Sequence, residues 1–250
     1  MSADQALSKV PEVTLTFWII KILATTLGET GGDAVSMSMN LGYLVSSGIF
    51  AVVFVIAVLA QIRARRFHPL LYWATIIATT TLGTTLADFA DRSLGIGYTG
   101  GASILLLVVV ASLILWHLTL GSIAVSSVST PAAETFYWIT IMFSQTLGTA
   151  LGDWTADTAA LGFGGGALLF SALLLLVVAA YYWTGISRTI LFWVAFVLTR
   201  PLGAVVGDLL DKPHAAGGMA LSRVAASAVL LAVIVGGVLF LPQRAAERQH

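Results

Sequence analysis

Four aspartates occupy equivalent places in a pattern that recurs along the chain. The pattern reads W-x8-LG-x4-D-x8-G and occurs four times without an insertion. Its aspartates are Asp33, Asp88, Asp153 and Asp208. Chance does not preserve such spacing in four separate places, so the chain is built from four copies of one repeat.

Polar residues precede these aspartates at intervals of four. Positions four, eight and twelve residues before an aspartate lie on the same face of a helix as the aspartate itself. The polar residues at these positions are Lys21, Thr25, Glu29, Thr80, Thr84, Gln145, Thr149 and Arg200, and the other positions hold Ile76, Ile141, Phe196 and Ala204. We therefore expect four polar stripes around one axis, which form an ion or substrate pathway with a ring of carboxylates at its outer end.

The carboxylates are the candidate metal ligands, because hard cations such as magnesium and manganese prefer oxygen ligands. The candidate set is Glu29, Asp33, Asp88, Asp153 and Asp208. Two other interpretations of the aspartates stay open: ordinary interfacial residues, or caps that fix the following turn. An acid at the C-terminal end of a helix opposes the macrodipole, which disfavours a casual placement.

Three charged residues lie deeper in their helices: Lys21, Glu29 and Arg200. A charge at mid-bilayer costs about 2.5–3.5 kcal/mol on insertion scales. These residues either form a structural network that joins the first and seventh helices, or they bind a substrate. Two cations and one anion require a further anion, which a repeat aspartate or a substrate would supply. Gln145 shares its repeat position with Thr25 and Arg200, which indicates one interior layer that differs between copies.

The elements that position these residues are eight apolar segments of roughly 20 residues, the length that crosses about 30 Å of hydrocarbon as a helix. They lie near residues 14–33, 41–60, 70–90, 98–119, 134–154, 163–183, 189–209 and 219–241. Their apolar runs are continuous, without the period-two alternation of a barrel. The predicted fold is an all-α integral membrane protein with eight transmembrane helices, in which the first helix of each repeat faces the centre and the second faces lipid.

The repeats cover residues 14–60, 70–119, 134–183 and 189–241 of a single membrane domain, 1–250, with a linker at 121–134 between two halves. Because each copy holds two helices, all copies enter the membrane from the same side. The repeats are therefore parallel and related by pseudo-two-fold or pseudo-four-fold symmetry. We expect the glycines of the Leu-Gly pairs to let helices approach closely. The repeat tryptophans, Trp18, Trp73, Trp138 and Trp193, are typical of an interfacial belt.

The composition supports a membrane location. Hydrophobic residues make up 58% of the chain and charged residues 10%, whereas soluble domains carry about 25% charged residues. The formal net charge is zero, which argues against a nucleic-acid partner. The polar start of the chain lacks the pattern of a cleaved signal peptide.

Lysine and arginine are distributed unequally between the two ends of the predicted helices. One end has Lys9, Arg63, Arg65, Arg66, Arg188, Arg244 and Arg248, and the other has Arg92, Lys212 and Arg223. The richer end is expected in the cytoplasm, so both termini are predicted to be cytoplasmic.

The sequence resembles a family of bacterial inner-membrane proteins described as four tandem copies of a repeat of unknown function. The segments that carry the resemblance are TTLGETGGD, TTLGTTLAD, QTLGTALGD and RPLGAVVGD, and the match runs from about Phe17 to Leu241. The fourth copy departs most, with Pro201 in place of threonine and no hydroxyl at Ala204. The resemblance implies two membrane helices per copy and a bacterial inner-membrane location.

The favoured functional hypothesis is a transporter of a small cation, with divalent metals such as manganese among the candidates. No ATP-binding motif is present, so transport would be driven by an ion gradient, and we expect no cofactor. One alternative is a carrier of an anionic or zwitterionic solute bound by Lys21 and Arg200. Another is a structural or signalling membrane module that transports nothing.

An enzyme is not expected, because no nucleophile–base or metal-ligand constellation of a known type is evident. The expected partners are the lipid bilayer and a small ion or solute. The sequence predicts no particular oligomeric state.

Overall fold

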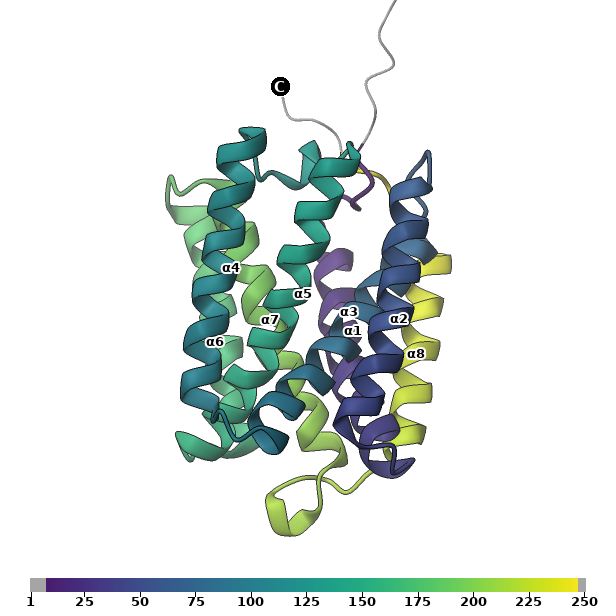
Figure 1. Ribbon diagram of the computed structural model, residues 1–250. Coiled ribbons are helices and arrows are strands. Elements are labelled where there is room, and N and C mark those ends of the chain that lie inside the picture. The colour runs from purple at the N-terminus through teal and green to yellow at the C-terminus, as the bar shows by residue number, and fades with distance from the viewer. Residues whose placement is uncertain (1–7, 247–250) are drawn as a thin grey trace, which may run out of the picture.

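The computed structural model describes residues 8–246, and its main elements are eight long helices that run side by side as one bundle (Figure 1). They are α1 (Leu15–Asp33), α2 (Gly42–Arg63), α3 (Pro69–Asp88), α4 (Tyr98–Leu120), α5 (Pro131–Asp153), α6 (Gly162–Trp183), α7 (Arg188–Asp211) and α8 (Arg223–Phe240). The all-helical fold predicted from the sequence is confirmed. Each of the four repeats supplies one pair of consecutive helices.

The first helices of the four repeats form an inner ring. In this ring α1 packs on α3, α3 on α5, α5 on α7, and α7 on α1. Each second helix lies outside and packs on the first helix of the next repeat: α2 on α3, α4 on α5, α6 on α7, and α8 back on α1. The arrangement therefore closes on itself with approximate four-fold symmetry.

The outer helices are apolar and turn most of their surface away from the protein. In their most hydrophobic windows only 11% of residues are buried for α2, α4, α6 and α8, against 72% for the inner helices α3 and α7. Exposed leucine, isoleucine and valine side chains therefore cover the outside of the bundle. A surface of this kind requires lipid as its solvent, and the chain is a multi-pass membrane protein.

Six of the eight helices between residues 8 and 246 are long and apolar enough to cross a membrane by themselves: α2, α3, α4, α6, α7 and α8. Of the eight membrane spans expected from the sequence, six therefore have the length and hydropathy of a membrane span. The other two, α1 and α5, carry polar residues that lower their hydropathy, among them Lys21 and Glu29 in α1 and Gln145 in α5. Both lie in the inner ring, where these side chains are buried against protein.

The last glycine of each repeat marks the reversal between two helices. Gly42, Gly97, Gly162 and Gly217 all have positive φ, between 64° and 86°. Glycine adopts this conformation without the strain that a Cβ atom would cause. In the first three copies one π-helical turn separates the aspartate from the reversal: η1 (Ala34–Ser38), η2 (Phe89–Ser93) and η4 (Trp154–Thr158).

The fourth copy departs from this arrangement, since α7 continues to Asp211 without a π-helical turn. The helix expected from residue 219 begins only at Arg223, because the Ser222 hydroxyl caps it by accepting the Ala225 amide. The other predicted helix ends agree with the structure within three residues.

The two described ends of the chain lie together at one end of the bundle, which we call the terminal end (Figure 1). Pro11 and Ala245 form an antiparallel bridge, and the Glu12 amide donates to the Arg244 carbonyl at 2.8 Å. The opposite end, where the four repeat aspartates lie, is the aspartate end. That the terminal end faces the cytoplasm stays a prediction from the distribution of basic residues; Arg248 lies outside the described residues.

The glycines of the Leu-Gly pairs bring the inner helices into close contact. Each of these glycines packs against the next repeat, at the residue that precedes the equivalent glycine of that repeat by three positions. A Cβ atom at Gly28 would meet Thr80, one at Gly83 would meet Gln145, one at Gly148 would meet Arg200, and one at Gly203 would meet Thr25. The close approach predicted for these glycines is confirmed, and it runs once around the ring.

Gly83→Ala should destabilise the protein, since its new Cβ atom would lie 2.9 Å from the backbone of Gln145 and Thr146. Overpacking of this kind costs about 1–3 kcal/mol. Thermal unfolding of the detergent-solubilised protein measures the effect as a lower midpoint. Gly48→Ala in α2 is the matched control, because nothing lies within 4 Å of its new Cβ atom. Equal midpoints for the two variants would contradict the packing role of Gly83.

Candidate functional site

Four layers of buried side chains stack along the axis of the inner ring. Every member is at most 3% exposed. From the aspartate end, the aspartate layer is Asp33, Asp88, Asp153 and Asp208; the Glu29 layer is Glu29, Thr84, Thr149 and Ala204; the Arg200 layer is Thr25, Thr80, Gln145 and Arg200; and the Lys21 layer is Lys21, Ile76, Ile141 and Phe196. The structure thus buries every polar residue predicted from the steps of four.

Arg200 connects all four inner helices through one nitrogen. Its Nη2 atom lies 2.9 Å from Glu29 Oε2 of α1, 2.6 Å from Thr84 Oγ1 of α3, and 2.5 Å from Thr149 Oγ1 of α5. The Thr84 hydroxyl is also 3.1 Å from the Gly28 carbonyl. The Glu29–Arg200 pair joins the first and seventh helices, as the structural interpretation of these charges expects.

Lys21 does not join this network. Its side chain is fully buried, and its Nζ atom has no hydrogen-bond partner among residues 8–246. The ammonium group lies over the Phe196 ring, 4.2 Å from its centroid. Phe196 lies one helical turn before Arg200 on α7, so the two cations occupy adjacent layers. The further anion that the sequence requires for Lys21 is therefore not one of the repeat aspartates.

The four aspartates are buried and paired with basic residues. Arg92 lies 3.0 Å from Asp88 and 3.6 Å from Asp153, while Lys212 lies 2.5 Å from Asp33 and 3.1 Å from Asp208. Asp33, Asp88 and Asp153 form no side-chain hydrogen bond that caps the following turn, so the capping interpretation is wrong for these three. That the aspartates lie at the membrane interface stays a prediction.

Arg92 and Lys212 were not among the site residues predicted from the sequence. Each lies four residues after a repeat aspartate, so extending the spacing of four by one step beyond the aspartates would have found both. Burial disfavours the Lys212 ammonium, but the carboxylates of Asp208 and Asp33 outweigh it and raise the pKa of Lys212. Arg223, 3.3 Å from Asp211 and 3.8 Å from Asp33, adds a third basic group at the aspartate end.

Only part of the predicted metal-ligand set comes together. Carboxylate oxygens of Glu29, Asp33 and Asp208 lie within 4.8 Å of one another, and all three residues are buried. We call these three the acid cluster. Asp88 and Asp153 lie outside it and share Arg92 instead. The acid cluster offers oxygen ligands to a cation, but Arg200 and Lys212 already contact its members.

Several polar atoms of the Arg200 layer have no hydrogen-bond partner within residues 8–246. They are Nε and Nη1 of Arg200, both side-chain amide atoms of Gln145, and the Thr80 hydroxyl. A buried polar group without a partner costs about 1–3 kcal/mol. The layer therefore contains more hydrogen-bonding capacity than its own side chains use.

An aromatic layer closes the axis at the terminal end. Phe17, Tyr72, Tyr137 and Phe192 lie four residues before the Lys21 layer, and the two tyrosine hydroxyls are 2.6 Å apart. The repeat tryptophans pack beside this layer. Trp73, Trp138 and Trp193 are at most 4% exposed, so the interfacial belt expected for these three is wrong. Trp18 is partly exposed, and its place in such a belt stays a prediction. Trp193 donates to the Ile123 carbonyl and Trp73 to the Gln243 side chain.

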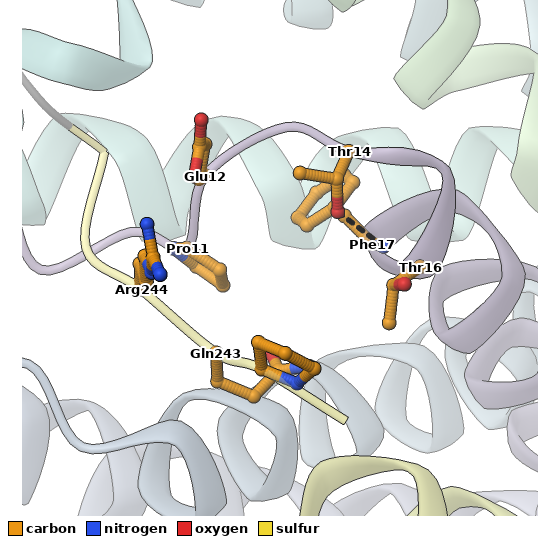
Figure 2. A pocket seen from close by; sticks show the side chains of 8 residues that line it. Pro11, Glu12, Thr14, Thr16, Phe17, Gln243 and Arg244 are labelled. Carbon is orange, nitrogen blue, oxygen red and sulfur yellow. Dashed lines mark hydrogen bonds between the residues drawn. The ribbon is translucent and has the colours of Figure 1, made fainter.

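A surface pocket lies at the terminal end, above the aromatic layer (Figure 2). The segments before α1 and after α8 form it together, and its lining residues are Pro11, Glu12, Thr14, Thr16, Phe17, Pro242, Gln243 and Arg244. Figure 2 shows the Thr14 hydroxyl accepting the Phe17 amide, which caps α1. Phe17 thus belongs both to the pocket and to the layer that closes the axis.

Comparison with known proteins agrees with the repeat architecture. A family model described as Repeat of Unknown Function (DUF347) matches the chain at residues 16–67, 71–122, 136–187 and 191–248. No curated protein and no solved structure matches the chain. Each matched segment contains one inner helix and the outer helix that follows it. The chain therefore belongs to the DUF347 repeat family, of which it carries four tandem copies.

Proposed function

We propose that this protein is a membrane transporter of a small cation, which binds at the acid cluster of Glu29, Asp33 and Asp208. The observation that carries the proposal is the convergence of three buried carboxylates within 4.8 Å at the axis of a membrane bundle. Oxygen ligands of this kind suit hard cations, and divalent metals such as manganese are the first candidates. Transport is driven by an ion gradient, and no catalytic step is part of the proposal.

The charges around the acid cluster favour the uptake of a positive ion. Arg223 lies between Asp33 of the cluster and the neighbouring Asp211. When ionised, the four carboxylates of Glu29, Asp33, Asp208 and Asp211 carry four negative charges, and the basic groups that contact them, Arg200, Lys212 and Arg223, carry three positive charges. One negative charge is therefore left for a cation. Intramembrane charges of this kind are rare and mark ion pathways in membrane proteins.

Lys212 supplies a way to exchange the bound ion. It follows the last residue of α7, and its side chain is 12% exposed at the aspartate end. Its ammonium group contacts Asp33 and Asp208, two of the three cluster members. A tethered ammonium in that place competes with an incoming cation and returns when the cation leaves. The Lys212 side chain thus supplies a counter-charge to two carboxylates of the cluster.

Asp208→Asn should abolish cation binding and flux. Metals that bind the native state raise its thermal unfolding midpoint, so manganese, magnesium and calcium are each titrated against the purified protein. Manganese entry into proteoliposomes is followed with a dye that manganese quenches. Asp157→Asn is the control, because Asp157 is acidic but exposed in η4, outside the cluster. Absence of any metal-dependent rise in the unmodified protein, or an unchanged rise in Asp208→Asn, would refute the proposal.

Lys212→Met should tighten cation binding by about tenfold, which corresponds to about 1.4 kcal/mol. The repeat itself supports the choice of methionine, since Met37 occupies the same position in the first copy. The measurement is the metal concentration at half of the maximal thermal shift. Arg92→Met is the matched control: it removes a basic residue that pairs with Asp88 and Asp153, and it should leave that concentration unchanged. Equal changes in both variants would exclude competition by Lys212.

A further inference from the structure

Two cations lie close together in the middle of the bundle, and only one of them contacts an anion. Arg200 pairs with Glu29 at 2.9 Å. Lys21 has no ion pair and no hydrogen bond within residues 8–246. The other carboxylates at the axis are the four repeat aspartates, which pair with Arg92, Lys212 and Arg223 at the aspartate end. One positive charge in the interior is therefore left without a counter-charge.

The unpartnered polar atoms around this charge are mainly donors. Lys21 Nζ carries three N–H donors, and Arg200 Nε and Nη1 together carry three more. The Thr80 hydroxyl and the Gln145 amide add donors from α3 and α5, and none of these atoms has a partner in the described part of the chain. Each of the four inner helices thus contributes one side chain with unused hydrogen-bonding capacity.

These four side chains lie within reach of one small ligand. Thr80, Gln145 and Arg200 belong to one layer, and Lys21 belongs to the next. Four residues of helix separate the two layers, a rise of about 6 Å. The Lys21 ammonium lies over the Phe196 ring, one helical turn before Arg200 on α7. A compact group between the two layers would contact the Lys21 ammonium on one side and the unpartnered N–H groups of Arg200 on the other.

We propose that Lys21, Thr80, Gln145 and Arg200 form a binding site for one small monovalent anion at the centre of the bundle. The single uncompensated positive charge sets the charge of the ligand. The donors set its chemistry: a carboxylate, or an inorganic anion of similar size such as chloride or nitrate. The two oxygens of a carboxylate can accept from two different donors, one from Lys21 Nζ and one from an unpartnered N–H of Arg200. This site shares no residue with the acid cluster, although Arg200 contacts Glu29 of that cluster, and the proposal does not depend on cation transport.

The repeats supply variants that should fold. Lys21→Ile places at this position the residue that the second and third copies carry, Ile76 and Ile141. Gln145→Thr similarly matches Thr25 and Thr80. Arg188→Gln is the matched control for loss of one basic residue, because Arg188 lies exposed at the start of α7 and contacts Tyr181 rather than the axis.

The test is a thermal-shift titration of the purified full-length protein with the sodium salts of formate, acetate, chloride and nitrate. Sodium gluconate at equal ionic strength is the reference, because gluconate is too large for the site. The unmodified protein and Arg188→Gln should show a saturable rise in unfolding midpoint with at least one small anion. Lys21→Ile should lose this rise, and Gln145→Thr should need about tenfold more anion. A response to formate and acetate alone identifies a carboxylate ligand, and a response to chloride or nitrate identifies an inorganic one.

Three outcomes would overturn the proposal: no rise above gluconate in the unmodified protein, an unchanged half-maximal concentration in Lys21→Ile, or an equal loss in Arg188→Gln. If Lys21→Ile does not fold, Gln145→Thr decides the matter by the same criterion. Asp208→Asn separates the two proposals, since it should lose the metal response and keep the anion response. Loss of both in that variant would show that the anion effect depends on the acid cluster and would count against a separate site.

Discussion

The burial of Arg200 is the constraint on which the centre of this protein depends. A guanidinium in a dry interior is tolerated only when acceptors surround it, and removal of one partner from a buried ion pair costs about 3–5 kcal/mol. Here the acceptors come from all three of the other inner helices: Glu29, Thr84 and Thr149. The four helices must therefore hold a fixed register. Gly148 leaves room for the Arg200 side chain in this arrangement, since a Cβ atom at Gly148 would collide with the aliphatic part of Arg200.

The helix packing, the ion pairs at the aspartate end and the central layers differ in their degree of symmetry. The packing of helices is close to four-fold, because each glycine of a Leu-Gly pair receives the next repeat in the same way. The charges at the aspartate end are two-fold: Arg92 joins the aspartates of the second and third copies, and Lys212 joins those of the fourth and first. The central layers have no symmetry, since Lys21, Glu29 and Arg200 each occur once. A shared scaffold thus presents a unique set of charges at its core.

The repeat made most of the fold predictable, because fixed spacing defined the helices, their parallel arrangement and the face that each inner helix turns to the axis. Of the two interpretations left open for the buried charges, the network that joins the first and seventh helices is the one that contains the Arg200–Glu29 pair. Local patterns could not show how neighbouring copies meet. The pairing of Arg92 with Asp153, for example, joins helices of different repeats through residues 61 positions apart. The buried tryptophans were misjudged because an amphipathic ring suits both a lipid interface and a buried layer whose neighbours accept its N–H. Only the tertiary structure distinguishes the two environments, as in the hydrogen bond from Trp193 to the Ile123 carbonyl.

The distribution of buried charge also bears on how an ion would move through the bundle. Each level of the axis holds buried side chains: aromatic rings near the terminal end, then Lys21, then the Arg200 network, then the paired aspartates. A permanently open pore would need water along this path, and the aromatic layer does not provide it. Under the transport function proposed above, movement of an ion requires ion pairs to exchange partners. Lys212 and Arg200 are placed to do so because each contacts the acid cluster. For the transport function proposed above, a carrier with alternating access fits these features better than a channel does. Arg92 and Lys212 each join aspartates from different halves of the chain, so such a motion would have to act on both of these bridges if it separates the halves.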